Sequence, residues 1–171
     1  MISRRSIRIK VFQTIYELEQ QGTPPESGVA RRMLDEKIQD TTYLLASVTH
    51  LLFRLADYVL IHANQKASKL MATQEDKNIN IKLAGNLILQ NMKDNASLTE
   101  VLKKGKLVTL FEPDFIRQLF LPLLETPEYQ AYIASPEHSE ADDKKILLFI
   151  FRHLIMEQEI ATAFLSERFM C

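Results

Sequence analysis

The sequence predicts an all-α fold, a single helical bundle of about seven helices that includes one long heptad-like helix. Only 4 of the 171 residues are glycine and 6 are proline, so long segments contain no helix breaker. Within these segments apolar residues recur at steps of three and four, the period of a helix. Alternation typical of a strand is confined to a possible extended piece at 107–111. We therefore expect one all-α domain over residues 1–171.

The first helix is expected to begin at Arg4 and to end at the glycine- and proline-rich turn of residues 22–28. Its first turns are basic: Arg4, Arg5, Arg8 and Lys10 precede the first acid, Glu17. At about 100° per residue the three arginines fall on one arc of the helix. Such a cluster can neutralise nucleic-acid phosphates, although a solvated helix end would have the same composition.

A long helix is expected between residues 29 and 70, where neither glycine nor proline occurs. It would be about 60 Å long if continuous, or a pair of helices with a kink. Its heptad-like pattern favours packing within the chain over an intermolecular coiled coil, because the flanking helices also have apolar faces. The positions that form the pattern are Leu34, Ile38, Thr41, Leu45, Val48, Leu52, Leu55 and Val59.

Capping signals predict the helices that follow. Thr73 begins a capping box before a helix near 79–92, and Ser97 begins a second box before a short helix that ends near Gly105. Pro113 suits the first position of the next helix, which Pro122 is expected to distort.

The remaining elements are turns at Pro127 and Pro136 and two final helices. Ser139 is expected to cap a helix with an apolar face at Ile146 and Leu154. A last short helix is expected over 157–168.

Composition restricts the class of protein. The net charge of −1 means that an RNA site must be local, and the basic cluster is the best candidate. The apolar stretch 51–61 is broken by Arg54 and Asp57, and the charged start has no signal-peptide core, so we expect a cytoplasmic protein without a membrane segment. The single Cys171 cannot form an internal disulfide.

Neither a catalytic site nor a cofactor site is predicted. The histidines are dispersed and lack metal-ligand spacing, and there is no glycine-rich phosphate loop. Asp142 and Asp143 are adjacent acids at a helix start, where the helix dipole explains them. The four histidines are His50, His62, His138 and His153. We expect a protein that is not an enzyme.

The first helix resembles the opening of NusB, the bacterial transcription antitermination factor, in its arginine run followed by the stripe of residues 11–16. The segments 112–114, 128–132, 135–137 and 142–145 are similar to the first part of an unusually long form of that family. The family's C-terminal helical signature is absent here. The chain is therefore expected to be the N-terminal part of a longer architecture, whether a truncated gene product, a designed fragment or a diverged paralogue.

The resemblance implies an RNA-binding antitermination factor that binds boxA-type single-stranded RNA together with NusE, a protein of the small ribosomal subunit, in a complex with RNA polymerase. Arg4, Arg5 and Arg8 would contact the RNA, with Lys10 as a weaker member.

Two alternatives stay open at this point. Phe12 and Tyr16 could stack on unpaired bases, although the core stripe is the favoured place for both rings. The helix from Leu34 to Val59 could instead serve as a dimerisation or docking surface in a helical interaction module without RNA binding. In that case a homodimer is possible.

Overall fold

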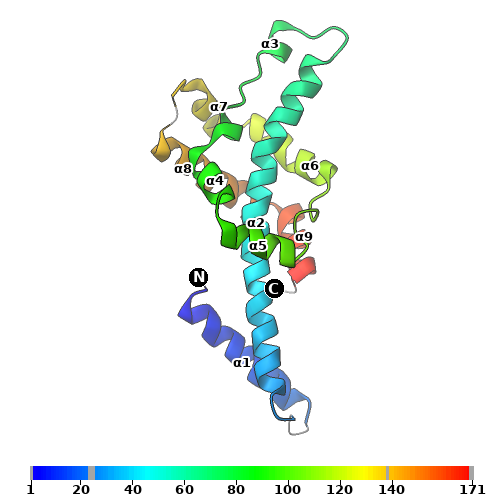
Figure 1. The fold of residues 1–171 in the computed structure, drawn as a ribbon. Coiled ribbons are helices and arrows are strands. Elements are labelled where there is room, and N and C mark those ends of the chain that lie inside the picture. The colour runs from blue at the N-terminus through cyan, green and yellow to red at the C-terminus, as the bar shows by residue number, and fades with distance from the viewer. Residues whose placement is uncertain (1, 23–25, 138, 170–171) are drawn as a thin grey trace. The chain divides into compact units, whose positions relative to one another are not determined.

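The computed structural model describes residues 2–22, 26–137 and 139–169. The described residues form nine α-helices, one 3₁₀ helix and one π-helical segment, and no strand (Figure 1). This confirms the all-α prediction, with more helices than expected because some predicted helices are divided. The elements are α1 Arg4–Gln20, α2 Val29–Ala67, α3 Gln74–Lys77, η1 Lys82–Gly85, α4 Leu87–Lys93, α5 Ala96–Lys104, α6 Pro113–Leu124, α7 Pro127–Ala134, α8 Glu140–Phe149, η2 Ile150–Met156 and α9 Glu159–Phe169.

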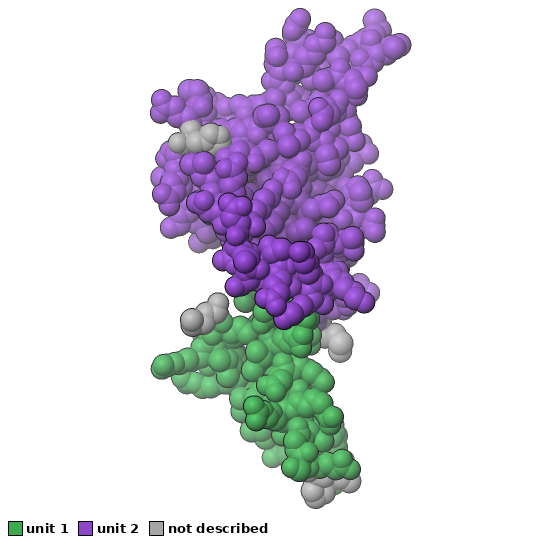
Figure 2. Space-filling view, viewed as in Figure 1, with its two compact units in different colours: residues 1–45 green, residues 46–171 purple. Residues whose placement is uncertain are grey.

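The chain divides into two compact units, residues 1–45 and residues 46–171 (Figure 2). Unit 1 contains α1 and the first part of α2, and unit 2 contains the rest of α2 and all later elements. The expected single domain over residues 1–171 stays a prediction.

The second part of α2 is the central core helix of unit 2. Leu51, Leu55 and Val59 are completely buried along it, at the helical spacing of four. The later helices supply side chains that are at most 2% exposed, among them Leu83, Leu89, Ile116, Leu119, Phe120, Leu123, Ile150 and Ile155. The expected long helix is therefore confirmed as one continuous helix, and Leu55 and Val59 of its heptad-like pattern are buried within the chain.

The length and composition of α2 are sufficient for a membrane span, contrary to the expectation that Arg54 and Asp57 interrupt every candidate. However, 44% of its most apolar window is buried within the protein. A buried core helix meets the same criterion, since its apolar side chains cover neighbouring helices instead of lipid. The absence of a membrane segment stays a prediction.

The helix expected near 79–92 is divided at Asn86. This side chain is completely buried, and its Oδ1 accepts hydrogen bonds from the amides of Ile88 and Leu89, each at 3.1 Å. Asn86 is therefore the N-cap of α4, and η1 ends before it. The capping box at Thr73 is confirmed, but it begins only the four-residue α3.

Two further capping predictions differ from the structure. The N-cap of α5 is Asn95, whose Oδ1 accepts from the Leu98 amide at 3.0 Å, so Ser97 lies inside the helix. Ser139 is the N-cap of α8 but makes no side-chain capping bond. Pro113 is at the helix start as expected, and α6 continues through Pro122 for only two residues.

The last major helix is extended by a π-helical segment. α8 continues directly into η2, and the final helix α9 begins at Glu159 instead of 157. The neighbours Leu154 and Ile155 of η2 are both buried, at 4% and 0% exposure. The segment at 107–111 forms turns instead of an extended piece, and buries Leu107 and Phe111.

Candidate nucleic-acid interface

The basic helix α1 begins with a well-formed N-cap. The hydroxyl of Ser3 accepts a hydrogen bond from the Ser6 amide at 3.1 Å, so the helix begins at Arg4. The first turn contains no acidic residue. The arginines are thus added to the partial positive charge that unpaired amides create at a helix N-terminus.

One side of α1 faces the first part of α2 within unit 1. Thr14 is the only buried residue that the structure describes in α1. Nearby, the Lys37 ammonium of α2 donates a hydrogen bond to the Glu17 carboxylate at 2.7 Å. The inner side of α1 is therefore the side on which Thr14 lies.

The three arginines lie away from that inner side. Nine residues separate Arg5 from Thr14, which at about 100° per residue places them on opposite sides of the helix. Arg4, Arg5 and Arg8 are exposed and form no ion pair with any residue described. We call these three residues the arginine arc. Its guanidinium groups are available to a ligand.

Lys10 does not belong with the arginine arc. It is half-buried and lies four residues before Thr14, so both residues are on the same side of the helix. The Thr14 hydroxyl donates to the Lys10 carbonyl at 2.8 Å. The predicted group of four basic residues is therefore reduced to three that share one surface.

The aromatic residues of α1 are exposed, which contradicts the expectation that they join the core. Phe12 is 72% exposed and Tyr16 is 56% exposed, next to Ile9 at 48% and Ile15 at 51%. Among the described residues of unit 1, α1 packs against the first part of α2, which covers one side of the helix. The uncovered side combines the arginine arc with two aromatic rings.

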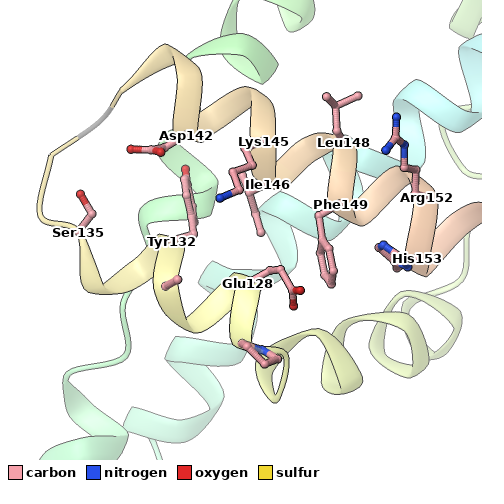
Figure 3. A pocket seen from close by; sticks show the side chains of 12 residues that line it. Glu128, Tyr132, Ser135, Asp142, Lys145, Ile146, Leu148, Phe149, Arg152 and His153 are labelled. Atoms are coloured by element: carbon pink, nitrogen blue, oxygen red, sulfur yellow. The ribbon is translucent and has the colours of Figure 1, made fainter.

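A concave feature lies between α7 and α8 in unit 2. The cavity has a volume of about 570 Å³ and extends to η2. Glu128 of α7 lies across it from Lys145 and Phe149 of α8, as Figure 3 shows. The lining is mixed in charge, with Glu128 and Asp142 in addition to Lys145 and Arg152.

The wall of this cavity is held by a buried polar network that the sequence did not reveal. The Asp143 carboxylate is completely buried and accepts from the Tyr132 hydroxyl at 2.6 Å and from the Leu87 amide at 2.8 Å. The Lys82 ammonium donates to the carbonyls of Tyr132 at 2.9 Å and Ser135 at 2.8 Å. Burial, together with the hydrogen bond to Asp143, raises the pKa of Tyr132 well above its ordinary value. Asp143 is thus a structural residue, in addition to its place in the first turn of α8.

The histidines are not brought together. His50 and His62 lie on the inner side of α2, where His50 Nε2 is 3.0 Å from the Val108 carbonyl oxygen. His153 is exposed, with Nδ1 2.6 Å from a Glu157 carboxylate oxygen. His138 and Cys171 lie outside the described residues. Within those residues no group of three histidine, cysteine or acidic side chains could hold a metal ion.

Comparison of the chain with protein-family models, with curated proteins and with solved structures finds no match in any of the three.

Proposed function

We propose that this protein is an RNA-binding transcription antitermination factor of the NusB type, and that the exposed side of α1 is its RNA site. The observation that supports this most is the coincidence of the arginine arc with two exposed aromatic rings, Phe12 and Tyr16, on one helix side. Arginine neutralises phosphates, whereas aromatic rings stack on bases. A soluble helix without a ligand has no evident need for both.

The favoured RNA is single-stranded. Bases in a duplex are stacked on each other, so Phe12 and Tyr16 can reach only unpaired bases. This agrees with the boxA-type element that the resemblance to NusB implies. The arginines would hold the backbone and would contribute no base specificity by themselves.

The protein partners in this proposal are NusE and an RNA polymerase complex. Both rest on the family resemblance of the first helix. A net charge of −1 also agrees with a partner that supplies part of the positive field around the RNA.

The test is fluorescence anisotropy of a labelled boxA-like RNA, titrated with this protein at two salt concentrations and against a scrambled RNA. We expect replacement of Arg4 and Arg8 with alanine to weaken binding about tenfold or more. The slope of log K against log salt concentration should decrease by the amount that corresponds to about two phosphate contacts. Replacement of Phe12 with leucine, which stays apolar but cannot stack as an aromatic ring, should weaken binding about fivefold or more.

The matched control removes two positive charges elsewhere. Arg32 of α2 and Lys144 of α8 are exposed and form no ion pair with a described residue, so their double alanine variant has the same net charge as the Arg4/Arg8 variant. If the two variants lose the same amount of RNA affinity, the loss is explained by net charge and does not locate the RNA site on α1. Absence of binding by a folded protein would contradict the proposal.

The second candidate, a helical interaction module that uses the heptad-like surface of α2, is weakened by burial. Leu55 and Val59 of that surface are completely buried in unit 2. Within the described part of that surface Leu45 is 52% exposed. An interaction module is better supported at α1.

A further inference from the structure

We propose that α1 binds α1 of a second copy of this chain, as an antiparallel pair that covers the exposed side described above. The centre line of that side follows heptad spacing, with successive steps of four, three, four and three residues. Its members are Arg5, Ile9, Phe12, Tyr16 and Glu19, which we call the α1 seam.

The α1 seam is self-complementary about Phe12. Arg5 lies seven residues before Phe12 and Glu19 lies seven residues after it. In an antiparallel pair with a two-fold axis at Phe12, each Arg5 therefore faces Glu19 of the second copy. The two ion pairs close the ends of the interface, and the two Phe12 rings meet at its centre.

The intermediate positions match in the same register. Ile9 and Ile15 are three residues from Phe12 on either side, so they lie at the same level of the pair and flank the two Phe12 rings. Arg8 and Tyr16 are four residues from it, so in the pair Tyr16 lies next to Ile9 of the second copy and Arg8 next to its Ile15. The apolar and aromatic positions between the two ion pairs are thus covered by the second copy.

The charges at the two ends of the α1 seam disfavour a parallel pair. A parallel pair in register would place Arg5 against Arg5 and Glu19 against Glu19, which is repulsive at both ends. Neither side chain has an ion-pair partner within the described part of the chain. In a two-fold pair the seam of each copy is covered by the other copy, and no seam is left for a third. The pair therefore predicts a dimer and no larger assembly.

The weak packing of α1 within its own chain supports a second copy as its partner. A helix of 17 residues with Thr14 as its one buried residue has little tertiary stabilisation. Phe12, Ile15 and Tyr16 leave more than half of their surface in water. A second copy would cover all three without any additional partner.

The dimer and the proposed RNA site share Arg5, Arg8, Phe12 and Tyr16. If the proposed function holds, RNA and the second copy compete for the same surface, and the dimer is the form that cannot bind RNA. The dimer itself does not depend on the proposed function.

Sedimentation equilibrium of the full chain over a range of protein concentrations tests the pair. The chain should show a monomer–dimer equilibrium. Arg5→Glu creates two repulsive contacts per dimer and should raise the dissociation constant about tenfold or more, as should Glu19→Arg. The double variant Arg5→Glu/Glu19→Arg exchanges the charges and should restore the dimer.

Arg32→Glu is the control, since it makes the same change in net charge at an exposed site on α2. It should leave the dissociation constant unchanged. Circular dichroism would show that each variant keeps its helices. The pair would be overturned if the protein is strictly monomeric, or if Arg5→Glu leaves the dissociation constant of the dimer unchanged. It would also be overturned if the double variant does not restore the dimer.

RNA binding is measured separately, with the Arg4/Arg8 variant that keeps both ends of the seam. If the dimer forms and RNA does not bind even the monomeric Glu19→Arg variant, the proposed function fails and the pair stands. If RNA binds a protein that never dimerises, the pair fails and the proposed function stands.

Discussion

At the scale of single residues, the adjacent acids Asp142 and Asp143 have different surroundings. Asp142 is exposed at the start of α8, whereas Asp143 is completely buried between α8, α7 and the start of α4. The Tyr132 hydroxyl and the Leu87 amide both donate to Asp143. In the sequence both acids look alike, because helix starts favour any acid. Only the fold brings Tyr132 and Leu87 to one of them.

We expect Asp143→Ala to lower the free energy of unfolding by about 3 kcal/mol, because it leaves two donors without their acceptor. Asp142→Ala should change it by less than about 0.5 kcal/mol. Urea denaturation followed by circular dichroism measures both. Similar effects at the two positions would contradict the structural role of Asp143.

At the scale of elements, prediction from the sequence succeeded where glycine and proline end a helix. α1 and α2 were expected from the turn between them, and α6 from Pro113 at its start. It failed at Asn86, whose side chain begins a new helix inside a run with continuous helical periodicity. Asparagine occurs in many places within helical sequences, and only its burial at 0% exposure marks it as a cap.

The candidate site was predicted in part for a related reason. The arginine arc follows from helical geometry alone, so Arg4, Arg5 and Arg8 were placed on one surface correctly. The positions of Phe12 and Tyr16 depend on which helices surround α1, which periodicity does not contain. An amphipathic pattern states that a side chain is apolar, and it does not state what covers it.

The weak packing of α1 has a measurable result. Amides of α1 should exchange with deuterium orders of magnitude faster than those at 51–62, since one buried residue stabilises α1 and the core of unit 2 stabilises that part of α2. Hydrogen exchange with mass spectrometry gives both values. Protection of α1 should rise with RNA or with protein concentration; equal protection from the outset would contradict the weak packing.

At the scale of the whole molecule, two buried histidines make the stability of the fold depend on pH. Burial lowers the pKa of His50 and of His62 from the ordinary value of 6.5. Nearby cations act in the same direction, namely Arg54 and Lys93 at His50 and Lys66, Lys69 and Arg117 at His62. Both rings are therefore neutral in the folded protein at pH 7.

The unfolded chain binds protons at these histidines as the pH falls through 6.5, and the folded chain binds them only at lower pH. The free energy of unfolding is therefore highest above pH 6.5 and falls below it. We expect a lower Tm at pH 5.5 than at pH 7.5, and a smaller difference in the His50→Gln/His62→Gln variant. Calorimetry at the two pH values measures both; an unchanged difference in the variant would assign the effect to other groups.

The symmetric spacing on α1 has a consequence for how the sequence can change over time. Arg5 and Glu19 are about 21 Å apart along one helix, too far for either side chain to sense the other within a single copy. In the antiparallel pair they touch across the two-fold axis, so a substitution at one position is compensated only by a substitution at the other. Descendants of this gene would then show correlated changes at two positions that are never neighbours in one molecule.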